Sequence, residues 1–283
     1  MRLRITLIAA VLIALPENVL GAPIRPAFVP DDTVTVHREG WLNRSASYTV
    51  RYNDPALGRT RIRTGVGAIQ FDNLFGTGEG QLIPLGSVGT FCIDLRDPLI
   101  PARPPGARAA IAQFEVQSLD YAPNGRPMSQ EKQTLLRRLF VDSIFGPIDP
   151  QANLPPPPGF SKKQLTEAFS LAVWEIVYEK PGKETNVTNG DWFRVTASTK
   201  EKKKVAAKAN EFLQAIHNPN APEGVVWALI PFNSSGTSQF QDRYQDLIVG
   251  YVPEPGTAVL LSGLGAMVGL ALARRRWGRA PAR

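Results

Sequence analysis

The sequence predicts an α+β fold, in which a mostly antiparallel β-sandwich or barrel-like sheet carries an inserted helical subdomain. Residues 33–95 mix β-branched and aromatic with polar side chains between turn signals, which is typical of strands. Residues 129–216 change to the apolar spacing of helices, and strand patterns return at 225–230 and 246–252. Because regular strand–helix–strand alternation is missing, an antiparallel sheet is favoured over a parallel one.

The strand patterns begin at residues 34–36, 48–50 and 62–71. Residues 91–95 alternate, which places Phe91, Ile93 and Leu95 on one face of a strand and Cys92 and Asp94 on the other. A further strand is expected at 114–121, before the helical region.

Two helices are expected in the first part of the insertion. Apolar residues at helical spacing predict one over 129–145. The next has a clear start signal, because Ser161 and Gln164 fit a capping box and Phe160 can pack onto Leu165 as a hydrophobic staple.

A third helix is expected over about 199–216. Ser198 and Glu201 fit its start, and Pro219 requires it to end beforehand. Its basic run, 200–204, is interpreted as a solvated helix face.

The N-terminus has the pattern of a secretory signal peptide. Arg2 and Arg4 form a charged region, residues 5–15 form an apolar region, and small residues follow at the expected cleavage positions. We therefore expect residues 1–21 to be removed by signal peptidase after Sec-type export.

The C-terminus combines a short motif, an apolar run and a basic end. The motif is Val252, Pro253, Glu254 and Pro255, and residues 257–273 are apolar. At 1.5 Å per residue this run reaches roughly 25 Å, close to what a transmembrane helix needs. Arg274, Arg275 and Arg276 would then stay on the cytoplasmic side.

This tail, residues 252–283, resembles the PEP-CTERM sorting signal of Gram-negative bacteria. The resemblance implies that an exosortase cuts near the motif. The protein would then be an inner-membrane-anchored precursor that passes to the cell surface or an extracellular matrix. The alternative is an ordinary C-terminal membrane anchor.

The positive charge of the chain belongs largely to these two end segments. The formal net charge is +7, but the tail after Gly256 holds five arginines and the signal peptide adds one net positive charge. The body, residues 22–251, is therefore close to neutral, and the basic-protein argument for nucleic-acid binding fails. Its length suits one domain, and its single cysteine, Cys92, excludes an internal disulfide.

Residues of the types that catalyse reactions or bind metals are scarce in the body. His37 and His217 lie far apart in the sequence, and both are expected at the surface. No cluster has metal-ligand spacing, no cofactor motif is present, and no carboxylate pair stands out. We therefore expect neither a metal nor a cofactor.

One pair of segments resembles bacterial thioester domains, including versions found on PEP-CTERM proteins. The segments are 91–94 and 168–178. In that family a strand cysteine attacks a glutamine carboxamide four residues before a tryptophan. Cys92 matches the cysteine and Trp174 the tryptophan, but Ser170 stands at the glutamine position and has no carboxamide. The resemblance therefore implies the fold, with degenerate chemistry, and predicts Cys92 close to Ser170 without a bond between them.

These observations predict an exported, non-enzymatic surface or matrix protein with a structural or adhesive body. Its expected partners are the export machinery, signal peptidase, an exosortase, exopolysaccharide or other surface components, and the membrane through the tail. The alternatives are a covalent thioester-type adhesin that uses Cys92, and a secreted hydrolase with dispersed carboxylates.

Overall fold

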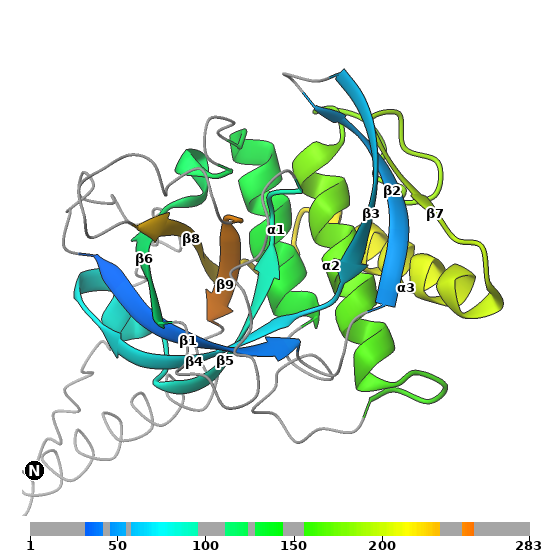
Figure 1. Cartoon of the computed structure of the whole chain (residues 1–283). Helices are drawn as coiled ribbons and strands as arrows, with labels where there is room; N and C mark the ends of the chain where they lie inside the picture. The colour runs from blue at the N-terminus through cyan, green and yellow to red at the C-terminus, as the bar shows by residue number, and fades with distance from the viewer. Residues whose placement is uncertain are drawn as a thin grey trace, which may run out of the picture.

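A closed antiparallel barrel forms the larger part of the fold in the computed structural model, which describes residues 32–41, 46–54, 58–95, 111–123, 128–143, 156–232 and 245–251. The strand order around the barrel is β1 (Thr33–Trp41), β4 (Ile69–Gly76), β5 (Gly86–Cys92), β9 (Leu247–Tyr251), β8 (Val225–Phe232) and β6 (Ile111–Gln117) (Figure 1). Of the two predicted architectures, the barrel is the one found.

A second, three-stranded sheet lies beside the barrel. Its order is β3 (Gly58–Val66), β2 (Ala46–Asp54) and β7 (Phe193–Thr196). All strand pairs in the described parts of both sheets are antiparallel, which confirms the predicted sheet type. The short strand β7 was not predicted, because four residues are too few to show a clear alternation.

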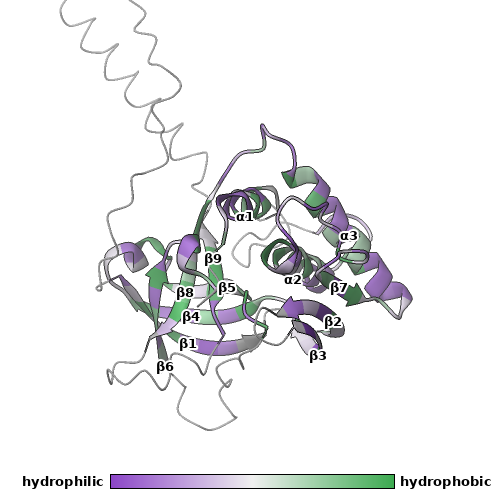
Figure 2. Cartoon of the chain, turned by 90° about the horizontal axis from the view of Figure 1, so that it is seen from above, coloured by the Kyte–Doolittle hydropathy of each residue, from purple (hydrophilic) through white to green (hydrophobic). Residues whose placement is uncertain are grey.

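The helices α1 (Gln130–Ser143), α2 (Lys162–Tyr178) and α3 (Lys200–Ile216) gather on one side of the barrel (Figures 1 and 2). Helix α2 contacts both sheets: its Trp174 bonds to the end of β5, and its Glu167 bonds to Tyr48 of β2. Nearly all of α2 is therefore buried, as expected for a helix that is apolar around most of its circumference. The predicted helical insertion is confirmed, but it is not self-contained, because β7 interrupts it and pairs with β2.

Three predicted boundaries are wrong. Residues 62–71 do not form one strand, because the chain leaves β3 at Val66, passes Gly67 with φ +150°, and enters the barrel as β4. The strand expected at 114–121 is β6, which ends at Gln117 and is followed by the 3₁₀ helix η2 (Leu119–Tyr121). Helix α3 is capped by Thr199, whose hydroxyl accepts from the Lys202 amide, and not by Ser198.

The capping box that predicted the start of α2 is present. The Ser161 hydroxyl accepts a hydrogen bond from the Gln164 amide at 3.2 Å, and the Gln164 side chain accepts one from the Ser161 amide at 2.9 Å. Two amides that the first turn leaves without helical partners are thereby satisfied.

We expect Ser161→Ala to lower the free energy of unfolding by about 1 kcal/mol, because the Gln164 amide then loses its acceptor. Urea denaturation measures the change. Ser161→Asp is the matched control, because aspartate also caps helices and should retain most of the stability. Equal stability of the alanine variant and the wild type would show that the cap contributes nothing.

Several predicted features fall outside the described residues. They are the signal peptide 1–21, the motif at 252–255, the apolar run 257–273 and the arginines at 274–276. Among the described segments, none of the helices combines the length and the hydrophobicity that a bilayer crossing requires.

Candidate functional site around Cys92

Cys92 is the last residue of β5, at the edge of the barrel next to helix α2. It pairs with Leu247 of β9, and its side chain is buried. One more backbone bond follows, from the Ile93 amide to the Asp246 carbonyl at 2.9 Å, before the pairing ends. The Cys92 thiol donates a hydrogen bond to the Asp94 carbonyl at 3.0 Å. The strand predicted over 91–95 is therefore too long. All five of these residues are buried, so the alternation separates two interior faces rather than an inside from an outside.

Helix α2 is fastened to this strand end by two hydrogen bonds from one face of the helix. The Trp174 indole donates to the Cys92 carbonyl at 2.7 Å, and the Tyr178 hydroxyl accepts from the Leu95 amide at 2.8 Å. Residues four apart lie on the same helix face, so both bonds hold the same side of α2 against the end of β5. The expected juxtaposition of the cysteine strand with the tryptophan helix is present.

Ser170 lies one turn before Trp174 on the same helix face and is also buried. Its hydroxyl donates to the Gly67 carbonyl at 3.3 Å, in the link between β3 and β4. The serine therefore has a structural partner of its own, and its hydroxyl satisfies a buried carbonyl at the point where the chain changes sheets. Direct side-chain contact between Cys92 and Ser170 stays a prediction.

The surroundings of the Cys92 thiol oppose its ionisation. Burial raises its pKa well above the ordinary value, and the nearby carboxyl groups of Asp94 and Asp246 raise it further. The hydrogen bond to the Asp94 backbone acts in the opposite direction but is outweighed. Because the thiolate is the nucleophilic form, the folded protein holds this cysteine in its unreactive state at neutral pH.

We expect Cys92 to react with iodoacetamide far more slowly in the folded protein than in urea, because the thiol is both buried and protonated. Mass spectrometry after timed quenching measures the extent of alkylation. Rapid stoichiometric labelling of the folded protein would contradict this account of the site.

Two buried carboxyl side chains, Glu175 in the last turn of α2 and Glu179 at its C-cap, bind the loop that leads into β7. Glu175 accepts from the Asn186 amide at 2.6 Å, and Glu179 accepts from the amides of Trp192 and Phe193. Gly190 fits between them, since a Cβ there would collide with the Glu179 carboxylate and the Phe193 carbonyl. The two side chains therefore hold this loop against the C-terminal end of α2.

This carboxyl pair was missed by sequence reasoning, although two glutamates four residues apart at the predicted end of a helix were a usable signal. The pKa of Glu175 is raised to about 8, chiefly by burial and also by the charge of Glu179, against the opposing hydrogen bond from the Asn186 backbone amide. Both side chains are enclosed, at 0% and 2% exposed, so neither presents an oxygen to a substrate.

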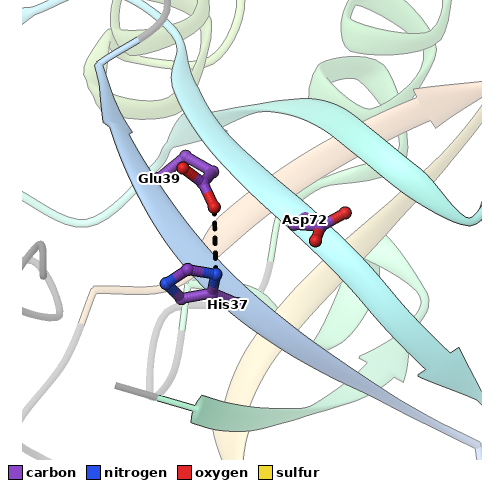
Figure 3. Close-up of side chains that lie close together, drawn as sticks. All are labelled: His37, Glu39 and Asp72. Atoms are coloured by element: carbon purple, nitrogen blue, oxygen red, sulfur yellow. Dashed lines mark ion pairs between the residues drawn. The ribbon is translucent and has the colours of Figure 1, made fainter. Parts of the chain in front are cut away.

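A second group of titratable side chains lies on β1 and β4 (Figure 3). His37 Nδ1 is 3.0 Å from a Glu39 carboxylate oxygen, and Asp72 is the cross-strand partner of His37. Each of the three residues offers a donor atom within 4.8 Å of the others, and an imidazole with two carboxylates could hold a divalent cation.

The two histidines were both predicted at the surface. His217 is exposed and bonds to the Thr185 hydroxyl at 2.8 Å, which confirms its placement. His37 corrects the prediction, because its side chain is only 13% exposed. The spacing of His37 and Glu39 on one strand was visible in the sequence, but Asp72 joins them only through the register of β1 with β4.

Comparison with known proteins adds three findings. No curated protein matches the chain by sequence. Among solved structures, the N-terminal thioester domain of a surface protein from Clostridium perfringens is similar with a TM-score of 0.36 and 12% sequence identity, over 72% of this chain and 98% of that domain. Similarity of this degree says nothing about the chemistry of Cys92.

The profile of the PEP-CTERM protein-sorting motif matches residues 252–276. The match spans the predicted motif, the apolar run and the three arginines. The chain therefore carries a PEP-CTERM protein-sorting motif at residues 252–276, directly after the last strand of its barrel.

Proposed function

We propose that this protein is an exported bacterial precursor, anchored in the inner membrane by its tail and passed by an exosortase to the cell surface or extracellular matrix. The observation that carries the proposal is the sorting motif at residues 252–276. The N-terminal pattern supports it, since a charged region and an apolar region precede small residues near position 21.

The position of the motif in the chain also fits this function. Strand β9 ends at Tyr251, so the barrel is complete one residue before the motif begins. Cleavage near Val252–Pro255 would leave every described strand and helix intact. Removing the tail would therefore release the body without unfolding it.

We propose a structural or adhesive role for the body, without catalysis. Cys92 is buried and its raised pKa keeps it protonated, while Ser170 offers no carboxamide for a thioester. Glu175 and Glu179 bind backbone amides instead of facing solvent. Surface components such as exopolysaccharide are the partners that this role calls for.

The sorting proposal is tested in a host that has an exosortase. We expect the wild-type protein to appear in the surface or released fraction, whereas Pro253→Ala combined with Glu254→Ala should stay in the membrane fraction at precursor length. The wild-type protein in a strain without the exosortase should behave like this variant.

The matched control is Pro181→Ala combined with Glu184→Ala, which changes the same residue types in the exposed loop after α2. It should be sorted like the wild type. Normal processing of the motif variant would contradict exosortase sorting, whereas membrane retention of both variants would point to a general folding or export defect.

The alternative, a covalent adhesin that uses Cys92, makes a different prediction. A working thioester takes up methylamine and gains its mass, and Cys92→Ala abolishes the uptake. We expect the purified wild-type protein to take up none.

A further inference from the structure

One end of the barrel is defined by the place where the chain leaves it. Strand β9 finishes at Tyr251, which pairs with Val225 at the start of β8. Because β9 is antiparallel to β5, the same end holds Gly86 at the start of β5, and Gly86 pairs with Asn73 near the end of β4. We call this end, with the loops that join its strands, the exit rim.

The exit rim gathers exposed apolar side chains. Of the seven large hydrophobic residues that are exposed in the described parts of the chain, six lie here and only Trp192 lies elsewhere. The six, with their exposed fractions, are Leu74 (46%), Phe75 (60%), Leu82 (56%), Leu85 (69%), Tyr121 (57%) and Val225 (36%). Single exposed hydrophobics are common, but this clustering at one end indicates a contact surface.

Four of these residues are brought together at the corner between β4 and β5. The Asn73 side chain donates to the carbonyls of Ile83 and Pro84, which fastens the loop containing Leu82 and Leu85 to the end of β4. A register shift between β1 and β4 follows Asn73, and Leu74 is the extra residue there. Leu74 and Phe75 are both exposed as a result, beside the fastened loop.

A short helix packs against this end of the barrel. It is the 3₁₀ helix η1 (Gly78–Leu82): the Thr77 amide donates to the Thr33 carbonyl, and Glu79 accepts from the Trp227 indole at 2.8 Å. The Asp32 carboxylate accepts from the Glu79 amide at 2.9 Å. Hydrogen bonds therefore hold η1 in place, and the apolar side chains at this end are exposed to solvent instead of filling the barrel.

The tail begins at this same end. Five residues, 252–256, separate Tyr251 from the apolar run 257–273. Fully extended, five residues span at most about 18 Å. The headgroup region on each side of a bilayer is roughly 5–8 Å thick, so a tail that enters the hydrocarbon at residue 257 keeps the rim close to the lipid interface.

We propose that the exit rim rests on the bilayer surface while the precursor is anchored, with Leu74, Phe75, Leu82 and Leu85 in the lipid interface. This inference depends on the membrane anchoring proposed above. It adds an orientation: the barrel is held with its β4–β5 corner against the lipid, and the sorting motif is held at the membrane surface for processing.

The charges at the rim specify how it would bind. The segments 73–87, 117–123 and 223–227 contain no lysine or arginine, while Glu79, Asp120 and Glu223 are acidic. Glu223 is paired with Arg138 of α1 at 3.5 Å, so this arginine is already engaged by a carboxylate. These segments therefore offer anionic headgroups no free cation to bind. Insertion of apolar side chains should drive the contact instead, so it should form on zwitterionic lipid and should not depend on salt.

The test uses the full-length precursor in phosphatidylcholine vesicles. Leu85→Cys is labelled with an environment-sensitive fluorophore and challenged with lipids that carry a nitroxide quencher near the headgroup. Arg59→Cys is the control, because Arg59 is also exposed to solvent but lies on β3 of the second sheet, away from the rim. The natural Cys92 is buried, and the labelled wild type gives its background.

We expect the probe at position 85 to be quenched at least about threefold more than the probe at 59, as for a side chain near the headgroup boundary. Vesicle flotation is measured on the same samples. Protein that floats but shows equal quenching at both positions would overturn the rim contact and leave the anchoring intact.

Protein that does not float would overturn the anchoring and the rim contact together. A third outcome is that the probe at 85 is shielded from an aqueous quencher, shows no lipid quenching, and crosslinks to a second copy. In that case the rim joins two protein molecules and the bilayer proposal is wrong.

Discussion

Replacing Trp174 by alanine is expected to lower the free energy of unfolding by about 3–5 kcal/mol, the range for deleting a large aromatic side chain from a core. Trp174 is 1% exposed and packs edge-on against Phe193 of β7. Its indole is also the donor to the Cys92 carbonyl. The substitution removes packing toward the second sheet and the hydrogen bond to the barrel at once.

Two further variants separate these contributions. Trp174→Phe keeps much of the volume but leaves the buried Cys92 carbonyl without its donor, so a smaller loss of about 1–3 kcal/mol is expected. Trp192→Ala removes the same side chain at a position that is 40% exposed and should cost much less. If urea denaturation shows equal losses for Trp174→Ala and Trp192→Ala, helix α2 does not join the two sheets as described.

The stability of the wild-type protein should fall as pH rises from about 4.5 to about 8, through the titration of Glu175. Chiefly because of burial, the pKa of this carboxyl is raised to about 8 in the folded protein, from an ordinary value of 4.5 in the unfolded chain. Between these values the folded state holds a proton that the unfolded state lacks. The stabilisation is therefore complete below the lower value and is lost as pH rises through the upper one.

The size of this change in the free energy of unfolding follows from the difference between the two pKa values of Glu175. One proton contributes up to about 1.4 kcal/mol per pH unit, so the total across the window is on the order of 4 kcal/mol. Glu175→Gln should remove this part of the slope, because an amide resembles the neutral acid and can still accept from the Asn186 amide.

The measurement is the free energy of unfolding at a series of pH values for the variant and the wild type. We expect the two to be similar near pH 5 and the variant to be the more stable at pH 8. Glu211→Gln on the exposed face of α3 is the matched control and should leave the slope unchanged. Parallel pH profiles for Glu175→Gln and the wild type would show that Glu175 is ionised in the folded state.

Local signals in the sequence predicted the helices well. The capping box at Ser161 and Gln164 needs only neighbouring residues, and the structure contains both of its hydrogen bonds. The end of β3 and the start of β4 show the limit of such signals. Apolar residues recur on both sides of Gly67, yet the two strands belong to different sheets, and such a pattern does not encode which neighbour a strand pairs with.

In the candidate sites too, residues could be predicted from local sequence signals, whereas their partners from distant segments could not. Cys92, Ser170 and Trp174 could be named from their residue types and spacing, and the bond from Trp174 to the Cys92 strand confirms that these segments meet. The partner of Ser170, the carbonyl of Gly67, could not be named, because it comes from the link between the two sheets. The exit rim could not be predicted either, since its exposed residues come from β4, β8, two 3₁₀ helices and a loop, which meet only when the barrel closes.

The most direct test of exosortase sorting is the mass of the C-terminal peptide of the mature protein released from cells. Proteolysis followed by mass spectrometry identifies the last residue. Sorting predicts that the chain ends near Val252–Pro255 and that peptides containing Arg274, Arg275 and Arg276 occur only in the membrane-bound precursor. Released mature protein that still ends beyond Arg276 would contradict sorting through this motif.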